Sequence, residues 1–323
     1  MSEPVQWRPS ASLASLRRRA QALATTREFF RARHVLEVET PAMINSPVSD
    51  VNIGSVRAEV PGREGAPLFL HTSPEYAMKR LLAAGSGDIY QICRVYRGAE
   101  RGRQHNPEFT MVEWYRLGFS LEDLMHEVAG LVQALLGCDL PVERLSYREA
   151  VRRHAGFDPL DADAATLQRT AQTLGLDATR ARAAGRDELL DLIVGAQVGP
   201  ALGASTLTFV DRYPASQAAL ARLDAQDPRL ALRFELYHRG MELANGYHEL
   251  ANAAEQRMRF NMDQQARKSR GLPIHSLDQN LLAAMDAGLP DCAGVALGFD
   301  RVLMLALDAA SIDDVLAFPV ERA

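Results

Sequence analysis

The alternation of apolar and polar residues divides the first part of the chain into helices and extended segments. Apolar residues recur at helical spacing from Leu13 to Phe30, with arginines on the opposite face, which predicts a first helix. The segment HVLEVETP then turns extended and stops at Pro41. The segment APLFLHTSPEYAMKRLLAAG predicts a strand followed by a helix that begins at Ser73-Pro74-Glu75. Proline suits a first helical turn, and Gly85 follows the end of this helix.

The rest of the chain continues this alternation. The segments DIYQICRVYR and NPEFTMVEWYRLG are rich in β-branched and aromatic residues, which predicts two strands joined as a hairpin around a long charged loop. Residues 120–205 are rich in Ala and Leu and predict a mainly helical region. Residues 232–250 return to strand character, with turn signals at Arg239-Gly240 and at Asn245-Gly246. A helix that ends near Gly271 and a final strand and helix, CAGVALGFDRVLMLAL, complete the pattern.

Hairpins separated by helical blocks favour an α+β fold with an antiparallel sheet over alternating βαβ units. The length of 323 residues, with 47% hydrophobic and 24% charged residues, is typical of a soluble globular protein. The net charge of −5 disfavours a nucleic-acid binder that works through a broad basic surface, but it permits a small cationic pocket.

Cysteine usage and apolar run length predict a cytoplasmic protein without a membrane partner. Cys93, Cys138 and Cys292 are scattered and form no C-x-x-C pair, which fits a reducing compartment. The N-terminal segment lacks the apolar stretch of a signal peptide. The apolar run VLMLAL is far shorter than the roughly 20 residues that span a bilayer.

Three segments carry more ionisable groups than their surroundings explain. In RVYRGAERGRQHNPEFTMVEWYR, Arg97 and Arg103 could clamp phosphate oxygens, Phe109 could stack on a base and Glu100 could accept from an amine. An exposed, salt-bridged hairpin tip is the alternative for this segment. Arg301 stands at the start of a predicted helix, where a bound anion would explain a cation at the positive end of the helix dipole. Its alternatives are pairing with Asp300 or exposure to solvent.

The third segment holds glutamates seven residues apart, Glu235, Glu242 and Glu249. A turn at His238-Arg239-Gly240 would place Glu235 and Glu242 across a hairpin, whereas a turn at Asn245-Gly246 would bring Glu242 and Glu249 together. Opposed carboxylates repel, so either arrangement favours a cation between them, and magnesium suits an all-oxygen site. The alternative is a solvated strand with its glutamates facing outward.

These three segments together suggest a magnesium–nucleotide site without a P-loop, because no G-x-x-x-x-G-K-[ST] sequence is present. The segment HELAN resembles the zinc-protease signature H-E-x-x-H, but Asn252 stands where the second histidine must be. Metalloprotease chemistry is therefore disfavoured.

The chain resembles the class II aminoacyl-tRNA synthetases. The segments HVLEVETPAMINSPVSD, RVYRGAERGRQHNPEFTMVEWYR and GVALGFDRVLMLAL are similar to their motifs 1, 2 and 3. TSPEYAMKRLL, HNPEFTM and ELANGYHEL are similar to the lysyl branch in particular. The resemblance implies one catalytic domain over residues 1–323, with a class II antiparallel β-sheet flanked by helices and a mainly helical insertion at about 120–205. It implies no anticodon-binding domain, and a homodimer formed through motif 1.

The resemblance also implies a role for individual residues. Arg97 and Arg301 would be the catalytic arginines, on the α-phosphate and the γ-phosphate of ATP. Glu235 and Glu242 would hold Mg²⁺. The remaining ATP-binding residues would be Gly98, Ala99, Glu100, Asn106, Phe109, Glu242, Leu243 and Gly298. The pocket for the amino acid would be lined by Ser73, Pro74, Glu75, Glu113, Tyr115, Asn245, Glu249 and Ala296.

A free-standing lysyl-type catalytic domain resembles the elongation factor P lysine ligases. That family activates (R)-β-lysine with ATP and transfers it to a lysine side chain of elongation factor P, so no tRNA partner is implied. The alternative is a stand-alone lysyl-tRNA synthetase-like enzyme that activates α-lysine for tRNA or another acceptor. A non-catalytic regulatory subunit is disfavoured because the ATP arginines and the magnesium glutamates are all in place.

Two positions depart from the lysyl pattern. Relatives often read Arg-Asn-Glu in motif 2, where that glutamate accepts from the adenine amine, but this chain has Ala99 at the glutamate position. The adenine contact then passes to Glu100 or to the backbone. Ala296 stands where lysyl-tRNA synthetases usually have glycine. Its methyl group would oppose an α-amino group and suit an amino group on the β-carbon.

Overall fold

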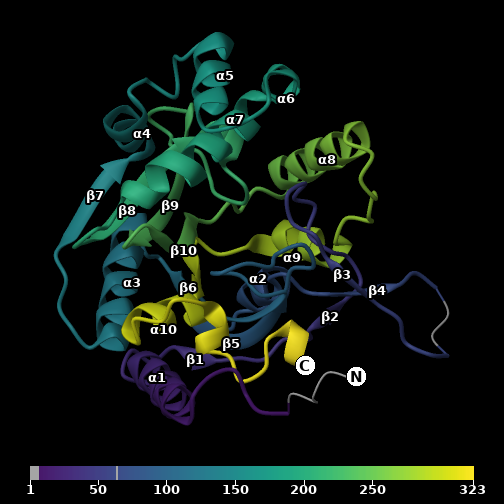
Figure 1. Ribbon diagram of the computed structural model, residues 1–323. Helices are drawn as coiled ribbons and strands as arrows, with labels where there is room; N and C mark the ends of the chain where they lie inside the picture. Colours follow the sequence, from purple (N-terminus) through teal and green to yellow (C-terminus); the bar gives the residue numbers. More distant parts are fainter. Residues whose placement is uncertain (1–6, 63–64) are drawn as a thin grey trace, which may run out of the picture. The chain divides into compact units, whose positions relative to one another are not determined.

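The computed structural model describes residues 7–62 and 65–323, which divide into two compact units (Figure 1). Unit 1 runs through Phe119 and also contains Gly130–Cys138 and Leu250–Ala323. Unit 2 contains Ser120–Ala129 and Asp139–Glu249. Helix α3 (Leu121–Leu136) has residues in both units.

The main strands of unit 1 follow the order β1-β5-β6-β11. Strands β5 (Ile89–Tyr96), β6 (Glu108–Leu117) and β11 (Cys292–Gly298) pair antiparallel. The short strand β1 (Leu36–Glu37) pairs parallel with β5. A separate antiparallel group has the order β2-β4-β3, with bounds Met43–Ile44, Leu68–Leu70 and Val56–Ala58.

Local capping explains where several helices of unit 1 begin. The Ser12 side chain accepts from the Ser15 N–H at the start of α1 (Leu13–Arg31). The Asn252 side chain does the same for the Glu255 N–H at the start of α8 (Ala253–Ser269). Such caps satisfy backbone donors that a helix leaves unpaired. The other helices are α2 (Glu75–Ala83), α8 (Ala253–Ser269), α9 (Gln279–Gly288), α10 (Phe299–Ala306), η4 (Ile312–Asp314) and η5 (Val320–Arg322).

The two faces of the unit 1 strands are covered by different helices, because neighbouring residues of a strand point to opposite faces. On one face, Met78 and Leu82 of α2 pack with Leu289 against Ile89 and Tyr115. On the other face, Phe30 of α1 stacks on Tyr90, with ring centroids 4.3 Å apart, and meets Trp114 edge-on at 5.3 Å. The apolar stripe that predicted α1 is therefore the part that closes this core.

The strands of unit 2 follow the order β10-β9-β8-β7. Strands β8 (Leu207–Pro214), β9 (Leu230–His238) and β10 (Met241–His248) pair antiparallel. Strand β7 (Val142–Ser146) pairs parallel with β8. The helices are α4 (Tyr147–Ala155), α5 (Ala164–Thr173), α6 (Ala178–Ala183), α7 (Arg186–Ile193) and the short turns η1 (Val194–Val198), η2 (Gly199–Ala201) and η3 (Ala215–Gln217). The apolar faces of α4, α5 and α7 share one core with β8 and β9.

The hairpin between β9 and β10 settles which of the two turn signals is used. Met241 pairs with His238, so the turn consists of Arg239 and Gly240, whose φ angles are 48° and 70°. Left-handed angles at both positions are those of a tight hairpin turn. A Cβ at Gly240 would lie 2.8 Å from the Pro200 carbonyl oxygen, so glycine is required there.

The expected turn at Asn245-Gly246 is wrong. Both residues lie inside β10, where Asn245 pairs with Glu235 and Gly246 with Phe234. The strand pairing satisfies their backbone groups, and this tertiary pairing overrides a local signal that is only statistical.

The predicted helices and strands of unit 1 and the α+β class are confirmed. The preference for antiparallel pairing needs one correction, because the edge strands β1 and β7 are parallel to their neighbours. The region 120–205 is mainly helical as expected, but it also contributes strand β7. None of the helices in the described part of the chain combines the length and the apolar character that crossing a membrane requires.

Candidate active site

Arg97 lies where the β5–β6 hairpin opens into its loop. Its N–H donates to the Pro107 carbonyl at 2.8 Å, and its guanidinium carbon lies 5.2 Å from the centre of the Phe109 ring. A guanidinium nitrogen is 3.6 Å from a carboxylate oxygen of Glu100, and the buried Nε has no hydrogen-bond partner among the described residues. A buried donor without a partner is costly, so this nitrogen favours an incoming acceptor such as a phosphate oxygen.

Gly98 and Ala99 are packed against the chain at Gly54. The Gly98 N–H donates to the Gly54 carbonyl at 2.9 Å, and a Cβ at Gly98 would lie only 3.3 Å from a methyl group of Val56. The Ala99 Cβ lies 3.7 Å from the position that a Cβ at Gly54 would take. The two residues after Arg97 are thus small and closely packed against the chain. Glu100 is the first carboxylate after Arg97.

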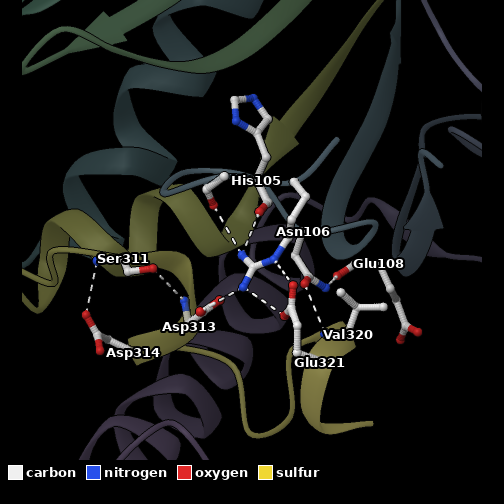
Figure 2. Close-up of polar contacts among 10 residues, drawn as sticks. His105, Asn106, Glu108, Ser311, Asp313, Asp314, Val320 and Glu321 are labelled. Carbon is white, nitrogen blue, oxygen red and sulfur yellow. Dashed lines mark hydrogen bonds and ion pairs between the residues drawn. The ribbon is translucent and has the colours of Figure 1, made fainter. Parts of the chain in front are cut away.

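The tip of this loop is fastened by the C-terminal segment of the chain (Figure 2). Arg101 donates to Glu321 through Nε at 2.5 Å and Nη2 at 2.8 Å, and to Asp313 through Nη2 at 2.9 Å. The Val320 N–H donates to Asn106 Oδ1 at 3.2 Å, while Asn106 Nδ2 donates to the Glu108 carbonyl at 2.6 Å. Both the oxygen and the nitrogen of the buried Asn106 amide therefore form hydrogen bonds that hold the loop.

Arg301 is the third residue of α10 and points to this loop. Its Nη2 lies 2.7 Å from His105 Nε2. Burial and the charge of Arg301 lower the pKa of His105, so the neutral ring accepts from the guanidinium. The alternative of pairing with Asp300 does not hold, because Asp300 instead bonds to Arg19 and to the Thr110 N–H.

Glu113 is the centre of a second group of site residues in unit 1. Its carboxylate is 2% exposed and accepts from Ser73 Oγ and from Tyr115 OH, each at 2.7 Å. Ala296 of β11 is its direct partner in the strand register, so the two Cβ atoms are neighbours. Burial and the negative charge of Glu113 raise the pKa of Cys93 to about 12.

The register also places Phe109 and Gly298, which the resemblance assigns to the nucleotide, relative to this carboxylate. Phe109 and Glu113 lie on the same face of β6, four residues and therefore about 13 Å apart. Gly298 pairs with Met111 between them, and because glycine has no side chain, nothing projects from β11 at this position. One face of β6 and β11 thus carries an aromatic ring at one end and a buried carboxylate at the other.

Glu75 begins α2 beside this group. Its N–H donates to Ser73 Oγ at 3.0 Å, and Pro74 occupies the cap position of the helix. One carboxylate oxygen of Glu75 accepts from Lys79 Nζ at 2.7 Å, and the Lys79 side chain is only 1% exposed. The fixed ammonium offsets one of the three carboxylates, Glu75, Glu113 and Glu249, that the amino-acid pocket was expected to contain.

In unit 2, Glu235 is held by two donors. Its Oε1 accepts from Arg233 Nη2 at 2.5 Å, and its Oε2 accepts from Tyr237 OH at 2.6 Å. Asn245, the strand partner of Glu235, accepts from Arg233 Nε through Oδ1 at 3.3 Å. These residues form one hydrogen-bonded cluster on β9 and β10.

The other unit 2 positions lie on or just after β10. Glu242 pairs with Tyr237 rather than with Glu235, so the two glutamates are offset along the hairpin. Leu243 is buried in β10. Glu249 follows the strand, is 1% exposed and forms a bridge with Ala221. Glu242 and Glu249 do not face each other across a turn.

The donor set on the β9–β10 hairpin fits magnesium. No group of three or more His, Cys, Asp or Glu side chains in residues 7–62 and 65–323 is arranged to hold a metal ion. Mg²⁺ is usually bound by one or two carboxylates, with phosphate and water oxygens as its other ligands. Each oxygen of Glu235 accepts one hydrogen bond, which leaves a second lone pair for a metal.

Comparison with known proteins places these features in a family. The family of class II tRNA synthetases (D, K and N) matches residues 3–322. The chain belongs to this family. It is 51% identical to proteins named elongation factor P–(R)-β-lysine ligase from Klebsiella pneumoniae subsp. pneumoniae, Salmonella dublin and Salmonella paratyphi B. Each match spans 326 aligned residues and covers 100% of both chains.

The structure of this class II synthetase family member contains site neighbours that were not assigned from the sequence. His105 meets Arg301, Lys79 meets Glu75, and Arg233 meets Glu235. Lys79 follows Glu75 by four residues in a predicted helix, a spacing that brings opposite charges together, so it could have been found. Arg233 and Glu235 lie on one face of a strand, but nothing local shows that their side chains are buried together.

Proposed function

We propose that this chain activates a lysine-type amino acid, (R)-β-lysine, with ATP and transfers it to the ε-amino group of a lysine on elongation factor P. The observation that carries the proposal is the buried Glu113 carboxylate with Ala296 beside it. A carboxylate already held by two hydroxyl donors retains lone pairs for a substrate ammonium group. The names of the relatives that are 51% identical over their whole length support the same reaction.

Unit 1 would bind the nucleotide. Arg97 would hold the α-phosphate, where its unpartnered Nε calls for an acceptor, and Phe109 would stack on the adenine. Arg301 would hold the γ-phosphate. Gly98, Ala99 and Gly298 would let the nucleotide approach the backbone, Glu100 would accept from the adenine amine, and Asn106 would fix the loop.

The same unit would supply part of the amino-acid pocket. Glu113 would bind one ammonium group of the substrate, positioned by Ser73 and Tyr115. The methyl group of Ala296 would occupy space beside Glu113, which disfavours an amino group on the α-carbon and suits one on the β-carbon. Pro74 and Glu75 would line the rim, with Lys79 offsetting the charge of Glu75.

The resemblance assigns the metal carboxylates and further substrate contacts to residues of unit 2. Glu235 and Glu242 would hold Mg²⁺, with Leu243 lining the nucleotide, and Asn245 and Glu249 would contact the amino acid. Magnesium, when bound, neutralises charge on the phosphates. The metal ligands, the ATP contacts and a homodimer stay part of this proposal.

The reaction would proceed in two displacements. The amino-acid carboxylate oxygen attacks the α-phosphorus, which forms an aminoacyl adenylate and releases pyrophosphate. A neutral lysine amine of the acceptor then attacks the carbonyl carbon, the C–N bond forms, the C–O bond to phosphate breaks, and AMP leaves while the amine loses a proton. The arginines would stabilise the charge that develops on phosphorus, so positioning and electrostatics would supply most of the rate enhancement.

Mass spectrometry of purified elongation factor P tests this function directly. With enzyme, magnesium–ATP and (R)-β-lysine, we expect one lysyl-sized mass increase on a lysine of elongation factor P. Arg97→Gln and Arg301→Gln should abolish it, whereas Arg153→Gln, on the surface of unit 2, should not. No increase with either α-lysine or (R)-β-lysine would refute the proposal, and acylation of tRNA instead would favour the stand-alone synthetase.

A further inference from the structure

Arg233 is a cation built into the carboxylate cluster of unit 2. Its guanidinium donates to Glu235 Oε1 at 2.5 Å, to the Gln217 carbonyl at 2.7 Å and to Asn245 Oδ1 at 3.3 Å. The guanidinium carbon also lies 4.3 Å from the centre of the Tyr213 ring. With 16% of the side chain exposed, these contacts fix the charge in place.

The fixed charge changes the electrostatics of the proposed metal site. Glu235 and Glu242 contribute two negative charges, and both interact electrostatically with Arg233. One positive charge is therefore already present beside these two carboxylates before any metal arrives. A free Mg²⁺ ion would have to approach a guanidinium that is hydrogen-bonded to one of its two carboxylates.

We propose that Arg233 makes metal binding depend on the nucleotide. In the free enzyme its charge satisfies Glu235 and repels a hydrated Mg²⁺ ion, which dehydrates reluctantly and needs several oxygen ligands. The phosphates of ATP add negative charge and oxygen ligands, so the metal is held only together with the nucleotide. This inference rests on the proposed function, because it assumes that Glu235 and Glu242 hold the magnesium of the adenylation reaction.

Arg233 is thus a positioning residue rather than a catalytic one. By donating to Glu235 and Asn245 it orients a metal carboxylate and a pocket amide together. Its planar fork matches this double role, which a lysine ammonium would fill less specifically. Substitution can remove the forked guanidinium of Arg233 while keeping its positive charge. Such a variant distinguishes control of metal binding by charge from a role in packing.

Manganese binding to the free enzyme, followed by electron paramagnetic resonance, measures the effect without catalysis. We expect wild-type enzyme to bind Mn²⁺ only when a non-hydrolysable ATP analogue is present. Arg233→Met should bind Mn²⁺ without nucleotide, at least about tenfold more tightly than the wild type, because a repelling unit charge is removed next to two carboxylates. Arg233→Lys keeps the charge and should retain the dependence on nucleotide.

Two further variants localise the effect. Adding Glu242→Gln to Arg233→Met should abolish the gained Mn²⁺ binding. Arg144→Met is the matched control, since Arg144 bonds to the buried Asp211 in the same unit at 2.9 Å rather than to Glu235 or Glu242. It should leave Mn²⁺ binding unchanged, and circular dichroism should show that every variant is folded.

The outcomes separate this inference from the proposed function. Nucleotide-independent Mn²⁺ binding by the wild type, or none by folded Arg233→Met, would overturn the role of Arg233 alone. If Arg233→Met does not fold, Arg233→Gln decides the point, because it removes the charge and keeps a hydrogen-bond donor, and it should also bind Mn²⁺ without nucleotide. No Mn²⁺ binding by the wild type with the ATP analogue would overturn the metal assignment itself, and this inference with it.

Discussion

Asp300 joins three elements of unit 1 at the start of α10, next to Arg301. The side chain is buried, with 1% of the residue exposed. Its Oδ1 bonds to the Arg19 guanidinium of α1, and its Oδ2 accepts from the Thr110 N–H of β6 at 2.6 Å. Arg19 also donates to Thr110 Oγ1 at 2.6 Å. We expect Asp300→Asn to lower the free energy of unfolding and to displace Arg301.

The magnitude follows from what the substitution leaves behind. The amide has the size of the carboxylate, so packing is kept, but Arg19 loses its charged partner while only 12% of its side chain is exposed. Removing one partner of a buried ion pair costs about 3–5 kcal/mol. Arg19 keeps Thr110 Oγ1 and the Val315 carbonyl as acceptors. These offset part of the loss, and about 2–3 kcal/mol remains.

Urea unfolding of a double-mutant cycle measures this interaction. Asp300→Asn combined with Arg19→Met should cost at least about 1.5 kcal/mol less than the sum of the single substitutions, because the partners are in contact. The exposed pair of Arg27 and Glu37, with Nε 3.0 Å from a carboxylate oxygen, is the control. Its coupling should stay below about 0.5 kcal/mol. Additive effects of Asp300→Asn and Arg19→Met would refute the reasoning.

Three further predictions concern the site. Ala296→Gly should raise the activation of α-lysine relative to (R)-β-lysine in pyrophosphate exchange, and an unchanged ratio would contradict the proposed role of the methyl group. Glu321→Gln weakens the fastening of the loop through Arg101, so the KM for ATP should rise about threefold at an unchanged kcat. Burial and Arg301 lower the pKa of His105 from its ordinary value of 6.5. Below that value the unfolded chain binds more protons at this position than the folded chain, so the free energy of unfolding rises with pH. His105→Asn should flatten this rise, measured by urea unfolding between about pH 5 and 7.

A surface ion pair of unit 2 controls for the loop prediction. Arg229 donates to both carboxylate oxygens of Asp227, at 2.9 Å and 2.8 Å, much as Arg101 does to Glu321. Asp227→Asn should leave the KM for ATP unchanged. If it raises the KM as much as Glu321→Gln does, the effect of Glu321 is not specific to the loop.

Local patterns were sufficient to predict most elements. The apolar stripe of α1, the proline at the start of α2 and the paired strands around the Arg97 loop all lie where the sequence indicates. These predictions succeed because each depends on residues within a few positions of one another. The placement of Arg97 next to Phe109 follows in the same way from the hairpin register.

Predictions that depended on choosing between distant partners were less secure. Asn245-Gly246 carries a turn signal, but pairing with Glu235 and Phe234 holds it in a strand. Strand β7 lies in a region whose composition predicts helix. The strand was missed because its partner β8 is more than 60 residues away in the chain. The sequence offers no local sign of either pairing.

The sequence by itself determined the α+β class, the hairpin that carries the arginine loop and the family to which the chain belongs. Only the tertiary structure decided the partners of the buried charges. Asp300 bonds to Arg19 rather than to Arg301, Glu235 bonds to Arg233, and the C-terminal segment holds the loop at Asn106. Secondary structure follows from short-range periodicity, whereas the partner of a charge depends on which side chains the folded backbone brings within hydrogen-bond distance.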